Sequence, residues 1–191
     1  MPEKFYIADC HFYHNNVINL DGRPFADMNE MIEQMVKRWN AKVSPNSEVY
    51  ILGDFSWGTV ENTKKLLEQL NGRKYLIVGN HDYYLKDNSI QGYFEWVKDY
   101  AEISDKGRRV VMSHYPILFY NKQWRGAYML HGHIHCTKDQ DKLDACIKMI
   151  QDNWDDGEPF NLINCFCGYS DYTPLTLKEW QNKLTKKNQG V

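Results

Sequence analysis

Five short apolar runs, each followed closely by Asp, Asn or His, constrain this chain more than any other feature of its sequence. The runs cover residues 5–8, 49–52, 75–78, 110–112 and 127–130. Their length and their β-branched or aromatic content predict buried strands. Ligands of open α/β sheets bind beyond the carboxyl ends of the strands, so we expect the polar side chains after the runs to meet at one edge.

The residues that follow the runs are metal-binding types. They are Asp9, His11, Asp54, Asn80, His81, His114, His131, His133 and His135. None of the seven histidines falls in a predicted helix or in the C-terminal tail. Histidine and carboxylate ligands together suit Mn, Fe, Zn or Ni, and Mn is our first choice. One carboxylate can bridge two ions about 3.5–4 Å apart, the usual arrangement for in-line displacement at phosphorus.

The order of elements indicates an α/β fold. Amphipathic patterns predict helices over residues 29–42, 59–70, 141–154 and 176–187, and a sixth strand over 162–166. The later strands follow one another with little helix between them, so we expect a sheet of mixed direction there. We see no linker or internal repeat and treat 1–191 as a single domain. The helix over 141–154 has no assigned function; packing or a dimer contact would explain it.

Composition and charge limit the function classes. The chain is 42% hydrophobic and 25% charged, with a net charge of −2, so it offers no bulk attraction for long nucleic acid. No stretch approaches the ~18 apolar residues of a membrane span, and the N-terminus lacks the apolar core of a signal peptide. The five cysteines match no zinc-knuckle spacing, and we expect reduced thiols in a cytoplasmic protein. The oligomeric state stays open.

Five sequence blocks, taken together, resemble a known motif series. They are Asp9-x-His11, Gly53-Asp54, Gly79-Asn80-His81-Asp82, His114 and Gly132-His133-x-His135, and they occur in the order found in calcineurin-like metallophosphoesterases. The segments 9–14, 23–25 and 39–40 and the ending 164–177 are similar to a small bacterial and phage branch of that family. The resemblance implies an αββα sandwich, in which two packed mixed β-sheets are flanked by helices. Residues 53–58 read Gly-Asp-Phe-Ser-Trp-Gly and lack the arginine of the phosphoprotein phosphatase and dinucleoside polyphosphate hydrolase branches.

The resemblance also implies roles for individual residues. One metal would be bound by Asp9, His11 and His135, and the other by Asn80, His114 and His133. Asp54 would bridge both ions. His81 would face the substrate as general acid or transition-state stabiliser. Independently of the resemblance, two nearby cations disfavour a protonated ring, so we expect Asp82 or another nearby carboxylate to hold its proton by pairing with it.

The expected reaction is hydrolysis of phosphate mono- or diesters by direct attack of a metal-bound hydroxide, without a covalent phosphoenzyme. The expected partner is a small phosphate ester. Two alternatives stay open: a nuclease acting on DNA or RNA, and a non-catalytic scaffold stabilised by its metals. Substrate contact is the hypothesis for His14, and orientation of a metal ligand for His131. Arg23 is interpreted either as a bidentate phosphate clamp or as a surface turn residue.

Overall fold

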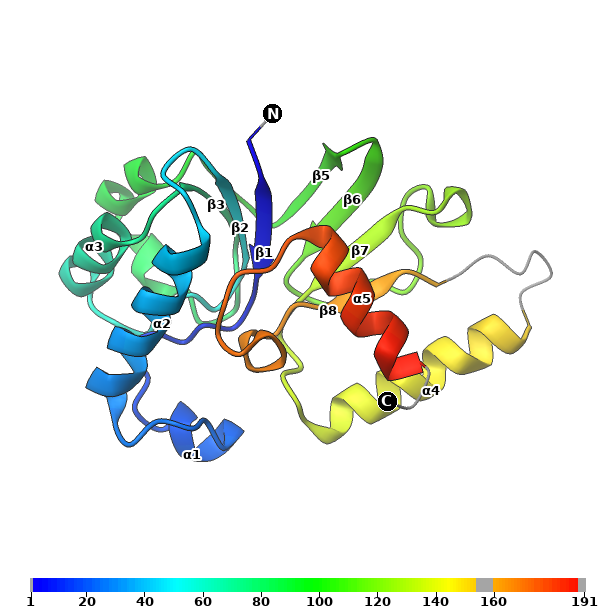
Figure 1. Cartoon of the computed structure of the whole chain (residues 1–191), viewed down its shortest axis with the longest axis horizontal. Coiled ribbons are helices and arrows are strands. Elements are labelled where there is room, and N and C mark those ends of the chain that lie inside the picture. Colours follow the sequence, from blue (N-terminus) through cyan, green and yellow to red (C-terminus); the bar gives the residue numbers. More distant parts are fainter. Residues whose placement is uncertain (1, 154–159, 189–191) are drawn as a thin grey trace.

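The computed structural model describes residues 2–153 and 160–188, and it contains two four-stranded sheets (Figure 1). The first sheet runs β1 (Lys4–Ile7), β2 (Glu48–Leu52), β3 (Arg73–Ile77) and β4 (Trp96–Lys98), all parallel. The second runs β5 (Tyr100–Asp105), β6 (Arg108–Ser113), β7 (Tyr128–His131) and β8 (Leu162–Asn164). Only β5 and β6 pair antiparallel, so the mixing of strand directions is confined to this second sheet.

Alternation along the strands builds two apolar layers from the first sheet. Tyr6 and Leu52 point into a cluster shared with Met112 and Leu130 of the second sheet, so the two sheets pack face to face. The alternate residues of the same strands, such as Ile7, point the other way and belong to a different cluster on the outer face. This follows from the two-residue period of a strand, which sends successive side chains to opposite faces.

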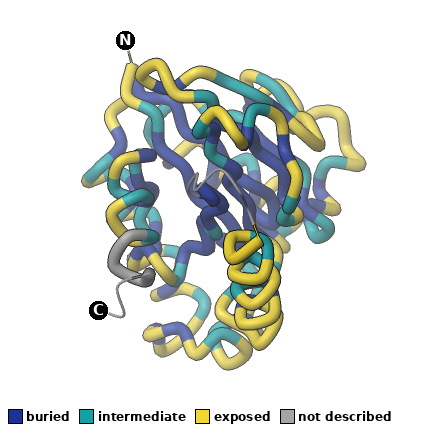
Figure 2. The backbone as a smooth tube through the Cα atoms, turned by 90° about the vertical axis from the view of Figure 1, so that its right-hand side faces the viewer, coloured by how far each residue is buried: buried dark blue, intermediate teal, exposed yellow. Residues whose placement is uncertain are grey.

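Helices cover the outer faces of this sandwich. α2 (Met28–Lys42) and α3 (Val60–Gln69) pack on the first sheet through residues such as Trp39 and Leu66. α4 (Lys138–Asp152) lies on the side of the second sheet (Figure 1). α5 (Leu177–Asn188) instead packs Leu177 and Trp180 into the cluster shared by the two sheets. Figure 2 shows the strands deeply buried and α4 largely exposed. The expected αββα architecture is therefore present, and no described helix is long and apolar enough to cross a membrane.

Several elements were missed or misplaced from sequence. The short helix α1 (Val17–Asp21) and the strands β4 and β5 were not expected. β4 has only three residues, and β5 carries polar residues at partly exposed positions, so neither forms an apolar run. The strand predicted over 162–166 ends at Asn164, because Phe166 forms an isolated bridge with Ala8 instead. The helix predicted over 141–154 begins earlier, at Lys138, and residue 154 lies outside the described residues.

Candidate metal centre and active site

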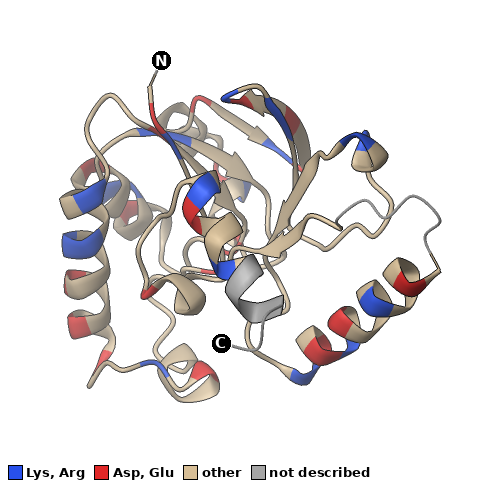
Figure 3. Ribbon diagram, turned by 45° about the vertical axis from the view of Figure 1, so that its right-hand side comes forward, with Lys and Arg blue, Asp and Glu red and all other residues tan. Residues whose placement is uncertain are grey.

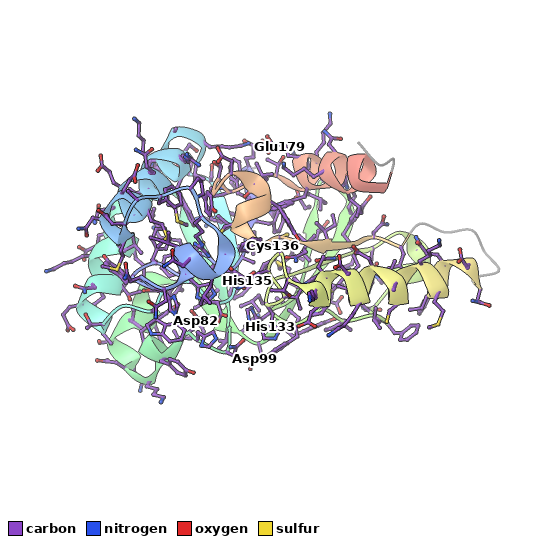
Figure 4. The ribbon with its side chains drawn as sticks, turned by 90° about the horizontal axis from the view of Figure 1, so that it is seen from below. Asp82, Asp99, His133, His135, Cys136 and Glu179 are labelled. Atoms are coloured by element: carbon purple, nitrogen blue, oxygen red, sulfur yellow. The ribbon has the colours of Figure 1, made fainter. Side chains whose placement is uncertain are left out.

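The side chains predicted from sequence meet at the carboxyl ends of the central strands. Asp9 and His11 follow β1, Asp54 follows β2, and Asn80 follows β3. His114 follows β6, and His133 and His135 follow β7 of the second sheet. Figure 4 shows Asp82, His133 and His135 gathered where the two halves of the molecule meet. The expected meeting of the polar residues at one edge therefore occurs.

The backbone at this edge adopts an unusual conformation. Positive φ angles occur at Asp9 (56°), His11 (49°), Asp54 (51°), His133 (73°) and His135 (44°). A side-chain-bearing residue in the left-handed region costs about 1–3 kcal/mol and persists only where surrounding contacts enforce it. Five of the seven predicted metal ligands therefore sit on strained backbone, which turns their side chains toward a common centre.

Two glycines allow the loops to approach one another closely. A Cβ added to Gly79 would lie 2.2 Å from the backbone nitrogen of Asp54. A Cβ added to Gly53 would lie 2.3 Å from Nδ1 of His114, and Gly53 also has a φ of 89°. Any larger residue would push the ligand loops apart, so glycine is required at both positions.

The first donor group consists of Asp9, His11 and His135, whose ligand atoms lie within 4.8 Å of one another. Nε2 of His11 and Nε2 of His135 are 3.1 Å apart. Nδ1 of His135 lies 2.8 Å from Oδ1 of Asp21 and donates its proton to that carboxylate. A neutral His135 ring then directs an Nε2 lone pair into the group, as a metal ligand requires.

The second donor group consists of Asn80, His114 and His133. Oδ1 of Asn80 lies 2.9 Å from both Nε2 of His114 and Nδ1 of His133. Nδ1 of His114 donates to the carbonyl oxygen of Leu52 at 2.9 Å, so Nε2 is the nitrogen that faces Asn80. Burial lowers the pKa of His114, but its bond to Asp54 and the charges of Asp9 and Asp54 raise that pKa overall. When the ring is neutral, Nε2 is also an acceptor. Two acceptors that face each other at this distance repel unless a cation lies between them. The donor set therefore fits a metal ion.

Asp54 lies between the two groups. Its Oδ2 is 3.7 Å from Nε2 of His11 and 3.5 Å from Nε2 of His114. Its Oδ1 accepts the backbone N–H of His81 at 2.7 Å, which fixes the carboxylate. Asp9 also contacts both sides, because Asp9, Asp54 and His114 form a second compact group within 4.8 Å. The arrangement fits two cations with Asp54 as the shared ligand.

The charge states of His11 and Asp54 favour cation binding. Burial lowers the pKa of His11 to about 3, so its ring is neutral and can coordinate. Burial would raise the pKa of Asp54, but hydrogen bonding and proximity to His114 lower that pKa to about 2. Burial raises the pKa of Asp9 to about 6, despite the histidines around it. A divalent cation would offset the cost of keeping both buried carboxylates ionised.

His81 stands beside the ligands. Its Nδ1 is buried and has no hydrogen-bond partner among the described residues. Its ring centroid lies 5.8 Å from that of His11 and 4.6 Å from that of Trp57. This position beside both donor groups is open to the substrate contact expected of His81.

Asp82 does not pair with the His81 ring, so Asp82 is wrong as the expected partner of that ring. The Asp82 carboxylate accepts three backbone N–H groups, from Asp54 (3.0 Å), Phe55 (2.8 Å) and Gly79 (2.7 Å). It is buried and fully engaged in tying the loop after β2 to the loop after β3. Its role is to hold the two loops together.

The structure buries Arg23 and engages its guanidinium with protein groups, contrary to both interpretations made from sequence. The side chain is fully buried, and its guanidinium donates to the carbonyl oxygens of Cys10 (2.8 Å) and Asp9 (3.0 Å). It also binds Oδ2 of Asp21 at 2.8 Å. Arg23 therefore holds the loop after β1 from behind and is neither a phosphate clamp nor a surface turn residue.

Asp21 was missed from sequence. Its two oxygens contact His135 and Arg23, so it links a metal ligand to the loop that carries Asp9. Burial alone would raise its pKa, but the bond from His135 and the guanidinium lower it, so the carboxylate stays ionised. No apolar run precedes Asp21; its position two residues before Arg23 was the only local signal.

His14 and His131 take different places. The His14 ring lies 5.7 Å from the His11 ring and 4.3 Å from the Trp57 ring, at the rim of the site. His131 is fully buried, and its Nδ1 donates to the carbonyl oxygen of Gly132 at 2.9 Å. It thereby braces the turn that presents His133.

Comparison with known proteins identifies the family. Residues 5–163 match the model of the calcineurin-like phosphoesterases, and the chain belongs to that family. The uncharacterized protein MJ1445 of Methanocaldococcus jannaschii is 32% identical over 139 residues, which cover 72% of each chain. The gene 66 protein of Mycobacterium phage L5 is 30% identical over 164 residues, covering 71% of this chain and 78% of the relative.

A solved structure agrees with the fold. The protein of unknown function AQ665 from Aquifex aeolicus superposes with a TM-score of 0.68 at 25% identity, covering 95% of this chain and 99% of that one. The fold is thus that of a metallophosphoesterase, with buried Asp and His clusters suited to metal.

Proposed function

We propose that this protein hydrolyses phosphate mono- or diesters at a centre of two divalent ions, Mn being the first candidate. The observation that carries the proposal is the position of Oδ2 of Asp54 between His11 and His114, in the middle of two sets of converging lone pairs. Bound divalent ions would supply an activated water and neutralise charge on the phosphate oxygens.

The residues of the chain have separable tasks in this proposal. Asp9, His11 and His135 hold one ion, and Asn80, His114 and His133 hold the other. Asp54 is shared by both. His81 reaches the phosphate or the leaving oxygen through the ring nitrogen that the protein leaves unpaired. Asp21 and Arg23 keep the first donor group in register from behind.

The direct test combines metal content with turnover. The Mn-loaded protein should contain close to two ions per chain and hydrolyse bis-p-nitrophenyl phosphate. One ion per chain at full activity would contradict the two-metal proposal. Two ions per chain without hydrolysis of any mono- or diester would favour the non-catalytic scaffold instead.

The partner and the location are proposed from chemistry and charge. A small phosphate ester fits better than long nucleic acid, because acidic and basic residues alternate along helices such as α4 in Figure 3. Degradation of single-stranded DNA or RNA faster than small esters would favour the nuclease alternative. We keep the cytoplasm as the proposed location, consistent with the five free cysteines.

A further inference from the structure

A large aromatic side chain stands exposed next to the metal centre. Trp57 is 41% exposed, yet its ring centroid lies 4.3 Å from His14, 4.6 Å from His81 and 6.0 Å from Tyr83. Tyr83 is itself 55% exposed and meets the indole nearly edge-on, at 85°. The indole therefore presents open apolar surface directly beside the histidine proposed to reach the phosphate.

The backbone beneath this indole is fixed. The N–H of Trp57 donates to the carbonyl oxygen of Phe12 at 2.8 Å, and the N–H of Gly58 donates to Oγ of Ser56 at 3.1 Å. Oγ of Ser56 also lies 2.8 Å from Oγ1 of Thr63 at the first turn of α3. The indole is thus exposed without belonging to a loose loop. A surface held in place before binding loses little entropy when a ligand arrives.

The position of the indole indicates the kind of ligand group that would bind to it. An exposed indole face stacks with a planar π-system, and base–aromatic stacking tolerates any base. Imidazole rings and the two proposed divalent ions lie near the indole. Their positive charge disfavours a cationic group stacked on it. The Trp57 ring centroid lies 6.3 Å from that of the proposed metal ligand His11. A ligand that places its phosphate at the ions and a neutral planar ring on the indole fits a nucleotide, whose sugar joins the two.

We propose that Trp57, flanked by Tyr83 and His14, is the stacking platform for the base of a small nucleotide substrate. This inference rests on the proposed phosphoesterase function and names the substrate class of the same site. Trp57 would act on specificity, since it contacts the base and none of the reacting atoms.

The test is calorimetric titration of the Mn-loaded protein with adenosine 5′-monophosphate and with ribose 5-phosphate, which differ only by the base. The wild type should bind the nucleotide about 10- to 100-fold more tightly, the range expected from one stacked base. Trp57→Ala should remove this preference and leave binding of ribose 5-phosphate unchanged. Trp57→Phe should retain most of it.

Trp124→Ala is the matched control, because Trp124 is 57% exposed and its ring contacts no histidine among the described residues. It should alter neither affinity. Equal binding of the two ligands by the wild type would overturn the inference. So would an equal loss of both affinities in Trp57→Ala, or tighter binding of choline phosphate than of the nucleotide.

Hydrolysis of bis-p-nitrophenyl phosphate, measured in parallel, separates the two proposals. Hydrolysis without a base preference would overturn the stacking platform alone. A base preference that Trp57→Ala abolishes, in a protein that hydrolyses no ester, would support the platform and sink the phosphoesterase function.

Discussion

The loops after β1 and β2 are tightly packed, whereas the helix α4 is loosely packed. In the loops, ligand residues are fixed through backbone groups: His11 donates its N–H to the carbonyl of Asp54 at 2.9 Å, and Oδ1 of Asp9 accepts the N–H of His133, which follows β7, at 2.9 Å. Beside α4, by contrast, a groove of about 910 Å³ separates the helix from β8 and α5. Only Gln140 and Leu143 are buried on that helix.

This difference shows where the fold concentrates its constraints. At the metal centre, strained backbone, buried carboxylates and facing acceptors are held by many mutual contacts, so a single change affects several partners. Along α4, side chains border an open groove, so a single change affects few partners. Substitutions should therefore have large effects at the first region and small effects at the second.

The largest effect is expected from Asp54→Asn. The change removes the charge shared by both donor groups, so metal content and kcat should both fall, kcat by about 10⁴-fold or more. Elemental analysis and hydrolysis of bis-p-nitrophenyl phosphate measure the two losses. Asp105→Asn is the control, since Asp105 is also a buried carboxylate, hydrogen-bonded to Tyr6 at the far end of β5. Retention of both metals and activity by Asp54→Asn would contradict the shared-ligand assignment.

The next effect is expected from His81→Ala. The variant should keep both metals, because His81 belongs to neither donor group, and lose about 10²- to 10⁴-fold in kcat. The loss should be larger for an alkoxide leaving group than for p-nitrophenolate, which barely needs a proton. Comparing kcat for the two substrate types, with metal content checked, measures this. Equal losses would leave His81 an electrostatic contact to the phosphate and remove the general-acid role.

The sequence predicted the metal ligands better than the residues that hold them in place. Asp9, Asp54 and His114 lie within two residues of the end of an apolar run. Parallel strands bring their carboxyl ends together, so local pattern and topology suffice. Asp21 and Arg23 act through contacts with the loop after β1 and with His135, which no spacing reveals. Asp82 belongs to the motif block 79–82, but its partners are backbone N–H groups that only the folded loops supply. β5 was missed for a related reason: its polar positions are tolerated because they lie partly exposed.

A smaller effect is expected from Asp21→Asn. The amide can no longer compensate the guanidinium of Arg23, and it holds the Nδ1 proton of His135 less strongly. Metal affinity should fall by about 10- to 100-fold, as is usual when the partner of a ligand histidine is changed. Competition with a chelator measures it. Asp171→Asn, which alters a surface ion pair with Arg38, should leave the affinity unchanged.

The smallest effect is expected at α4 and tests the comparison itself. Ile147 borders the groove, so truncation to Ala leaves no closed cavity, and Ala also favours helix by a few tenths of a kcal/mol. Ile147→Ala should therefore lower the free energy of unfolding by less than about 1.5 kcal/mol, against about 2–5 kcal/mol for Leu66→Ala. Leu66 is fully buried on the inner side of α3. Its truncation leaves a closed cavity that solvent cannot fill.

Urea titration of both variants measures these costs, with Met149→Ala as an exposed-face reference expected within about 0.5 kcal/mol of wild type. Hydrolysis by Ile147→Ala should match wild type, because Ile147 contacts none of the metal-site residues described above. If Ile147→Ala is as costly as Leu66→Ala, α4 packs as tightly as the helices on the first sheet, and the groove is part of the core rather than its border.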